Sequence, residues 1–273
     1  MVFQQALDLR DESEELHALL APLDDASYDR KTQFKDWTLH DIVAHLHIFN
    51  WAAAESIRDG DAFAAWYAGF GRAMATENKS MREVTDDWLD EHESGVRGSA
   101  LLSRWRAFYR DFTDSVQGID PKKRVKWAGP DMSVRSSLTA RLMETWAHGQ
   151  EIYDLLGVER QDKDRIQGVA VLGVSTFGWT FVNRGLDVPT DAPYVRLTAP
   201  SGAVWEWNEP SEANRVQGSA TEFCQVVAQT RNIADTALDV VGQTATRWMS
   251  IAQCFAGAPE DPPAPGTRFR QSP

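Results

Sequence analysis

Cysteine and basic residues are scarce in this 273-residue sequence. Its two cysteines, Cys224 and Cys254, are too few for a disulfide framework, and both lie in apolar runs typical of buried free thiols. Lysine and arginine number 28 against 40 aspartates and glutamates, which gives a formal net charge of -12. Nucleic-acid binding usually requires a basic stripe, and an acidic protein is repelled by anionic membranes. We therefore expect no nucleic acid and no membrane as partners.

Long apolar runs are also missing. No stretch reaches the 18 or so apolar residues that predict a membrane span. The first residues, "MVFQQALDLRDESEELHALL", lack the basic flank and apolar centre of a signal peptide. These absences predict a cytoplasmic protein. What is present is a 42% hydrophobic share with eleven tryptophans, enough for a packed core and for rings that line a pocket or an interface.

Apolar residues at helical spacing predict four main helices in the first 157 residues, the pattern of a four-helix bundle. Thr38 with Asp41 three positions on predicts a capping box at the start of the second helix. Ser133 and Gly157 are suited to begin and close the fourth. The segment "AFAAWYAGFGRAMA" predicts a short helix or lid. The four main helices are expected at 2–23, about 38–58, about 80–117 and 134–156.

The pattern changes after a fifth expected helix at 164–184, whose glycines would permit close packing against a neighbour. Alternating residues around "PSG" predict a β-hairpin at 194–199 and 203–208. Two segments, "RVQGSATEFCQVV" and "ALDVVGQTATRWMS", each read as strand, glycine and helix. The sequence therefore predicts an α+β protein. Its expected parts are a metal-binding helix bundle at 1–158, a connecting helix at 159–190, a small α+β domain at 191–257 and a flexible tail at 258–273.

Two of the six histidines lie on apolar stripes of predicted bundle helices, His45 on the second and His148 on the fourth. Glu144 lies one turn before His148, on the same helix face. A buried carboxylate is costly unless it is paired or bound to a metal. Arg141, three positions back, could form an ion pair with Glu144. A buried Glu–His pair without metal is the other structural interpretation.

A metal site explains more of the pattern. His45, Glu144 and His148 would supply three ligands and leave a coordination position open, as in catalytic zinc sites. Nickel or iron would also accept this donor set. His47 lies about 200° around the helix from His45 and should not share the site. Asp41 and Glu151 fall on the ligand faces and are candidates for carboxylates that orient the histidines. Catalytic residues stay unassigned.

Two segments resemble a known family. "DWTLHDIVAHLHIFNWAA" resembles the second-helix signature of DinB-like metal-binding bundles, a tryptophan followed by a valine–alanine–histidine–leucine turn. "RLMETWAHGQEIYDLLG" resembles their fourth-helix signature, a glutamate and a histidine four positions apart with an acidic or amide group after them. The pairing is similar, in particular, to the mycothiol-dependent maleylpyruvate isomerase family.

The resemblance implies a zinc site in an N-terminal bundle, followed by a small α/β domain of sterol-carrier-like shape. Carried onto this sequence, the zinc ligands are His45, Glu144 and His148. Zinc would bind mycothiol or another small thiol and lower its pKa, and the thiolate would add to an electrophile. A carboxylate on the substrate would need a cation. Three arginines could supply it, although surface salt bridges explain each more simply: Arg82, Arg141 and Arg231.

The expected function is therefore a metal-dependent, thiol-dependent isomerase or transferase that acts on a small molecule. A hydrolase that uses metal-bound water at the same site is the alternative enzyme. A non-catalytic module that binds a small ligand is the alternative outside enzymes. Assembly as a homodimer stays open.

Overall fold

The computed structural model describes residues 3–272 and divides into two units, Met1–Gly149 and Gln150–Pro273. Helices dominate the first unit, with one short β-hairpin. Its elements are α1 (Gln4–Leu20), η1 (Asp25–Asp29), α2 (Leu39–Arg58), α3 (Gly60–Thr76), α4 (Met81–His92), α5 (Gly98–Ser115), β1 (Arg124–Val125), β2 (Met132–Ser133) and the start of α6 (Val134–Leu156).

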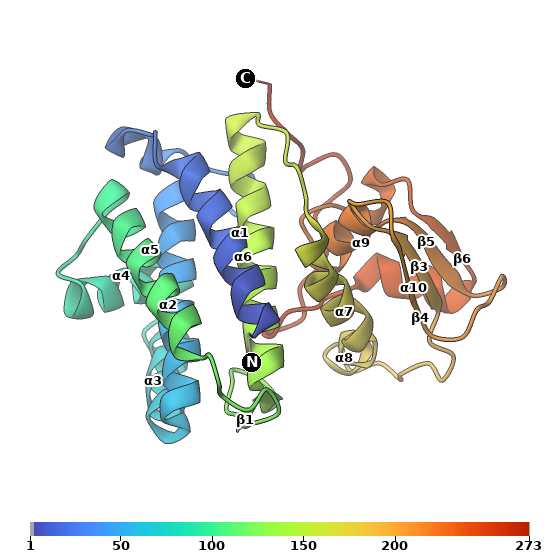
Figure 1. The fold of residues 1–273 in the computed structure, drawn as a ribbon, viewed down its shortest axis with the longest axis horizontal. Coiled ribbons are helices and arrows are strands. Elements are labelled where there is room, and N and C mark those ends of the chain that lie inside the picture. The colour runs from blue at the N-terminus through green and yellow to red at the C-terminus, as the bar shows by residue number, and fades with distance from the viewer. Residues whose placement is uncertain (1–2, 273) are drawn as a thin grey trace. The chain divides into compact units, whose positions relative to one another are not determined.

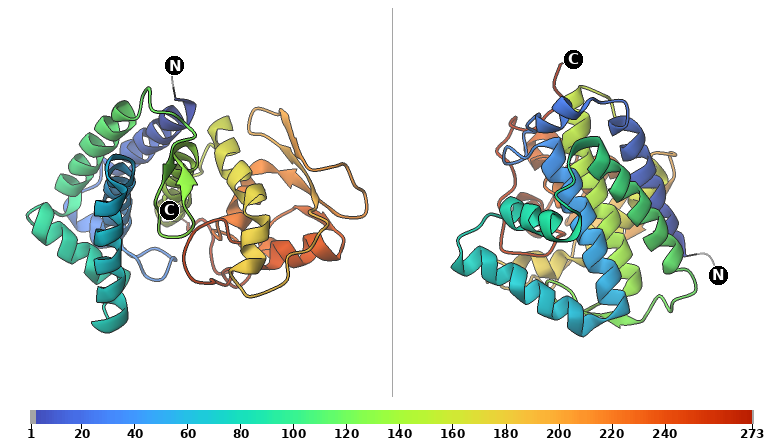
Figure 2. Two further views of the ribbon diagram at one scale, coloured as in Figure 1. Left: turned by 90° about the horizontal axis from the view of Figure 1, so that it is seen from below. Right: turned by 90° about the vertical axis from the view of Figure 1, so that its left-hand side faces the viewer.

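Four long helices, α1, α2, α5 and α6, form the predicted bundle (Figures 1 and 2). α5 contacts both α1 and α2. The core between them is large and apolar, because Leu9, Trp105 and Trp146 are completely buried. Burial of one such side chain stabilises the fold by about 1.5–3 kcal/mol. α3 and α4 are additions to the four-helix core, and both contact α2.

The predicted caps fix where the ligand-bearing helices start. The Asp41 amide donates to Thr38 Oγ1 at 3.1 Å, and the Thr38 amide donates to Asp41 Oδ2 at 2.8 Å, so the capping box is confirmed. The Ser136 amide donates to Ser133 Oγ at 3.1 Å at the start of α6. Gly157 follows the end of α6 with φ of 71°, a conformation that favours glycine.

The helix expected at 80–117 is divided into α4 and α5. The break lies at Ser94 and Gly95, whose φ values are 56° and 64°. The Gly95 amide donates to the Leu89 carbonyl at 3.0 Å, a bond six residues long that closes a helix end. Gly95 was the sequence signal for this break, and the surrounding helical periodicity concealed it.

The second unit is a mixed sheet with helices. Its elements after α6 are η2 (Asp164–Ile166), α7 (Gln167–Ser175), α8 (Phe177–Val182), β3 (Tyr194–Thr198), β4 (Val204–Trp207), β5 (Arg215–Ser219), α9 (Ala220–Val227), η3 (Ile233–Asp235), β6 (Asp239–Val241) and α10 (Gln243–Ile251). The described strands are ordered β4-β3-β5-β6. β3 pairs antiparallel with β4 and parallel with β5, and β5 pairs antiparallel with β6.

This topology confirms the predicted hairpin and both strand–helix units. The single helix expected at 164–184 is instead η2, α7 and α8, interrupted at Thr176. Gly173 serves the expected close packing, because a Cβ there would lie 2.7 Å from Val227 Cγ2 and 3.1 Å from Phe223 Cε1 of α9. The predicted domain boundaries at 158, 190 and 257 stay predictions.

Residues 258–272 contain no helix or strand but make several hydrogen bonds. Asn232 Nδ2 donates to the Pro263 carbonyl at 2.8 Å, and the Gln271 amide donates to the Asp154 carbonyl at 2.9 Å. Hydrogen bonds of this kind tie the segment to the rest of the second unit. Within residues 3–272, no helix is both long and apolar enough to cross a membrane.

Candidate metal centre

Three predicted ligands converge in the first unit. His45 comes from the second turn of α2, and Glu144 and His148 lie one turn apart on α6. Glu144 Oε2 lies 3.3 Å from His45 Nε2 and 3.4 Å from His148 Nε2. One ligand atom from each residue lies within 4.8 Å of the other two. The helical spacing that suggested a shared face therefore produces a real cluster.

The protonation states suit metal binding. Burial lowers the pKa of His45 to about 4, so its imidazole is neutral at neutral pH. Burial alone would raise the pKa of Glu144. Its hydrogen bonds with His148 and His45 outweigh this effect and hold that pKa well below the usual range. Metal ligands must be neutral imidazoles and ionised carboxylates, and these two side chains meet that requirement.

The spacing of the donors also fits a bound cation. Zinc binds histidine nitrogen and carboxylate oxygen at about 2.0–2.2 Å, so two tetrahedral ligands lie about 3.3–3.6 Å apart. The separations of 3.3 and 3.4 Å match this edge. The residues present fit a divalent metal.

Aromatic rings pack around the donors. The Trp37 ring stacks on the His148 ring, with centroids 5.4 Å apart and an interplanar angle of 2°. Phe34 meets the same imidazole edge-on at 5.2 Å, and Phe49 lies 4.7 Å from His45. Stacking of this kind restricts the rotation of the ligand rings. Trp37 is the tryptophan of the family signature, but its stacking on a candidate ligand was not predicted, and neither was the contact of Phe49 with His45.

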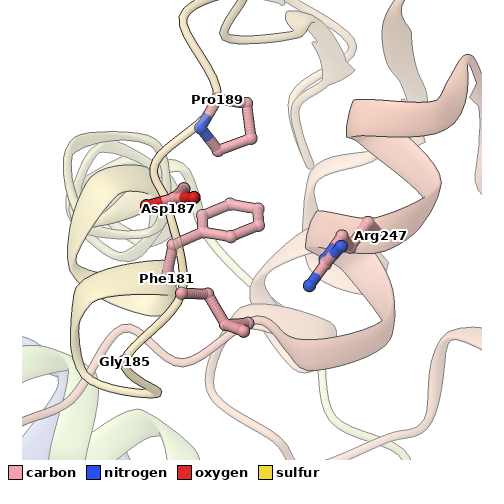
Figure 3. Close-up of a pocket in the computed structure, with 6 residues that line it drawn as sticks. Phe181, Gly185, Asp187, Pro189 and Arg247 are labelled. Atoms are coloured by element: carbon pink, nitrogen blue, oxygen red, sulfur yellow. The ribbon is translucent and has the colours of Figure 1, made fainter.

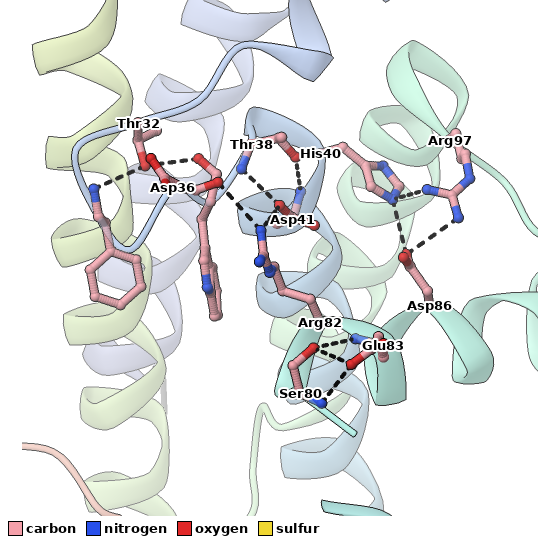
Figure 4. Close-up of polar contacts among 12 residues, drawn as sticks. Thr32, Asp36, Thr38, His40, Asp41, Ser80, Arg82, Glu83, Asp86 and Arg97 are labelled. Atoms are coloured by element: carbon pink, nitrogen blue, oxygen red, sulfur yellow. Dashed lines mark hydrogen bonds and ion pairs between the residues drawn. The ribbon is translucent and has the colours of Figure 1, made fainter. Parts of the chain in front are cut away.

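The two predicted orienting carboxylates have other partners. Asp41 forms the capping box with Thr38 and lies 3.5 Å from Arg82 Nη1 (Figure 4). Glu151 Oε1 accepts a hydrogen bond from Arg268 Nη1 at 2.9 Å. The structure thus brings together the three predicted ligands, while the orienting roles of Asp41 and Glu151 stay predictions.

The three candidate arginines differ in their partners. Arg82 donates to the Asp36 carbonyl (Figure 4), and Arg231 forms two bonds of 2.7 Å to Asp154. Arg141 is not at the surface, as our simpler interpretation had it, but is 2% exposed. The alternative ion pair with Glu144 is also not formed. Arg141 Nε donates to Asn50 Oδ1 at 3.0 Å instead, because α2 places this amide beside it.

A separate pocket lies in the second unit (Figure 3). It has a volume of about 260 Å³, and Arg247 of α10 faces the loop of Gly185 and Pro189 across it. It contains none of the metal donors. The cysteines do not form a second reactive centre either. Both are buried, and burial raises the pKa of the Cys224 thiol well above its ordinary value.

Known proteins with this fold and sequence point to one family. Residues 9–153 match the family described as mycothiol maleylpyruvate isomerase N-terminal domain. Two uncharacterized proteins from two strains of Mycobacterium tuberculosis are each 36% identical over 252 residues, which cover 92% of this chain and 95% of each relative.

Solved structures show the same fold. A crystal structure of the mycothiol-dependent maleylpyruvate isomerase aligns with a TM-score of 0.52 and 14% identity, over 84% of this chain and 89% of that one. A mutant of that isomerase gives a TM-score of 0.51. Because the sequence match covers more than half of the 273 residues, this chain belongs to the mycothiol maleylpyruvate isomerase N-terminal domain family.

Proposed function

We propose that this protein is a zinc-dependent isomerase or transferase that acts on a small electrophilic substrate. It would use mycothiol or another small thiol as its cosubstrate. The observation that carries the proposal is the convergence of His45, Glu144 and His148 in a bundle of this family. Three protein ligands leave a coordination position open, which is typical of catalytic zinc. A structural zinc site would have four.

The chain's own residues prepare the site for this chemistry. When bound, zinc would lower the pKa of a coordinated thiol so that its thiolate forms at neutral pH. Glu144 supplies a negative charge, and His45 supplies a neutral donor that need not lose a proton first. Trp37 and Phe34 hold the His148 ring and exclude water from one side of the donors.

The nucleophile would come from a bound thiol rather than from the protein. Cys224 is fully buried, its pKa is raised, and its Sγ donates to the Ile166 carbonyl at 3.6 Å. Cys254 is also buried. A buried thiol that stays protonated is a poor nucleophile.

Metal analysis tests the first part of the proposal. Protein produced with added zinc should retain about one equivalent per chain, because a preorganised three-ligand site binds zinc tightly. Glu144→Ala should lose it. An unaltered protein with less than about a tenth of an equivalent would contradict the site assignment.

Thiol dependence tests the second part. Zinc-loaded protein is assayed with small unsaturated electrophiles and with mycothiol, glutathione or bacillithiol in turn. The proposal expects turnover with one of these thiols and none without a thiol. Turnover that needs no thiol would instead support a hydrolase at the same centre.

A further inference from the structure

Arg141 is a buried cation that forms no ion pair within residues 3–272, although the Glu144 carboxylate acts on its charge from a distance. Arg141 is 2% exposed, and the one hydrogen bond of its side chain within residues 3–272 runs from Nε to Asn50 Oδ1. Its Nη2 is buried and has no hydrogen-bond partner within residues 3–272. Burial lowers the pKa of Arg141 only to about 10, so the guanidinium stays charged at neutral pH. An unpaired buried charge is costly, and such groups normally meet a counter-ion.

Asn50 has the same deficit. It is completely buried, its Oδ1 is used by Arg141, and its Nδ2 has no partner in the part of the chain that the structure describes. Two neighbouring side chains thus each present an unused N–H donor. Two N–H donors on planar groups match the two oxygens of a carboxylate.

This pair adjoins the metal donors. Arg141 lies three residues before Glu144 on α6, and its Cζ is 6.0 Å from the centre of the Phe49 ring. The His45 ring also contacts the Phe49 ring, with centroids 4.7 Å apart. Arg141 and Glu144 also influence each other electrostatically. The unused donors therefore lie one side-chain layer from the cluster.

We propose that Arg141 and Asn50 form an anion subsite that binds the carboxylate of a small substrate beside the metal centre. The placement beside an open metal position rests on the proposed function, but the subsite itself needs no metal. The charges agree with this ligand. A divalent cation with Glu144 and Arg141 carries two net positive charges, of which a thiolate neutralises one and a substrate carboxylate the other.

The test uses benzoate as the anion and benzamide as its uncharged analogue. Binding is measured by calorimetry on zinc-loaded and on chelator-treated protein. Benzoate should bind both forms, and benzamide should bind neither. Arg141→Gln should weaken benzoate binding by about thirtyfold or more, as expected when a buried charged partner is removed. Arg135→Gln is the matched control, because Arg135 lies on the same helix but is exposed.

If Arg141→Gln fails to fold, Asn50→Asp tests the anion subsite. The new carboxylate would sit beside the guanidinium and act as an internal counter-ion. The proposal expects a higher melting temperature than that of the unaltered protein, together with loss of benzoate binding. An Asn50→Asp protein that binds benzoate normally, or that melts earlier, would overturn the subsite.

Failure of the subsite and failure of the proposed function give different results. Benzoate binding that requires zinc and ignores Asn50→Asp would place the anion on the metal, which removes the subsite and leaves the metal proposal intact. The opposite case is an unaltered protein that takes up no zinc but binds benzoate, with this binding lost in Asn50→Asp. The missing zinc would then remove the metal proposal, and the subsite would stand.

Discussion

His45 and His47 lie two residues apart on α2 and yet occupy different surroundings. Both are buried, burial lowers the pKa of both, and each has Nε2 3.3 Å from a glutamate oxygen. His47 meets Glu93, whose other oxygen lies 3.8 Å from Arg104 Nε. That carboxylate thus has an arginine as a second basic partner besides His47.

Within residues 3–272, the Glu144 carboxylate that contacts His45 has no arginine partner of this kind. A second histidine, His148, directs its own Nε2 at the same carboxylate oxygen. The nearest arginine, Arg141, bonds to Asn50 rather than to Glu144. A buried His–Glu contact therefore does not by itself indicate a metal. Two features set the candidate metal site apart from the His47–Glu93 contact. A third donor converges there, and the Glu144 carboxylate forms no lysine or arginine ion pair within residues 3–272.

The largest expected effect separates the two glutamates. Glu144→Ala removes a ligand, so zinc affinity should fall by more than the roughly 10–100-fold that follows loss of an outer partner. Glu93→Ala should keep zinc affinity, because its histidine faces away from the site. Competition titration with a zinc-sensitive dye measures both. Equal losses in the two variants would abolish the distinction.

Zinc-induced stabilisation should separate the two histidines. Saturating zinc raises the melting temperature of any variant that retains the site. At a zinc concentration one hundred times Kd, binding adds about 2.7 kcal/mol to the free energy of unfolding. His47→Gln should show this rise and His45→Gln should not. Thermal melts with and without zinc give the answer. A rise in both variants would show that His45 is not a ligand.

Without metal, acid should destabilise the protein through both histidines. Each has an unfolded-state pKa near 6.5 and a lower folded-state value. As pH falls below 6.5, the unfolded chain therefore takes up protons that the folded chain does not. Stability is lost at up to about 1.4 kcal/mol per pH unit for each group. For His45 the loss ends near pH 4, its folded-state value.

Chemical denaturation of chelator-treated protein between neutral pH and pH 4 measures this loss. His47→Gln and His45→Gln should each flatten the pH profile. A profile that is unchanged in both variants would contradict the buried neutral state of these rings.

A smaller effect concerns the aromatic ring that holds a ligand. Trp37→Leu removes the stacking on His148 but no donor, so zinc affinity should fall by roughly tenfold. Trp51→Leu is the control, because Trp51 packs on Trp66 and Trp88 instead. Dye competition on the two variants measures the difference. An unchanged affinity in Trp37→Leu would remove Trp37 from the site.

The smallest effect is expected at Arg104, the exposed arginine beside the His47–Glu93 pair. The Arg104 side chain is 65% exposed, and surface ion pairs contribute little. Arg104→Ala should shift the melting temperature by less than about 2 °C and leave zinc binding unchanged. A larger shift would mean that the His47–Glu93 pair depends on this charge.

The sequence contained enough information for most of the main helices and for the three side chains that converge at the candidate site. Helical spacing placed Glu144 and His148 on one face, and the capping signal at Thr38 fixed where α2 begins. The strand–glycine–helix pattern also predicted β5 with α9 and β6 with α10 of the second unit. These features depend on local rules, namely periodicity, capping and turn chemistry, which act within a few residues.

Features that depend on distant residues could not be obtained in this way. The stacking of Trp37 on His148 joins a loop to a helix more than one hundred residues away. The partner of Arg141 depends on which α2 side chain faces it, and periodicity alone offered Glu144 three positions on. The break after α4 was misjudged because helical periodicity continues on both sides of Gly95.

The most direct test of the central claim is anomalous scattering at the zinc edge from crystals of the zinc-loaded protein. We expect a peak between His45 Nε2, Glu144 Oε2 and His148 Nε2, with at least one coordination position not filled by a protein ligand. A peak beside His47 and Glu93, or no peak at the three donors in a fully loaded protein, would contradict it.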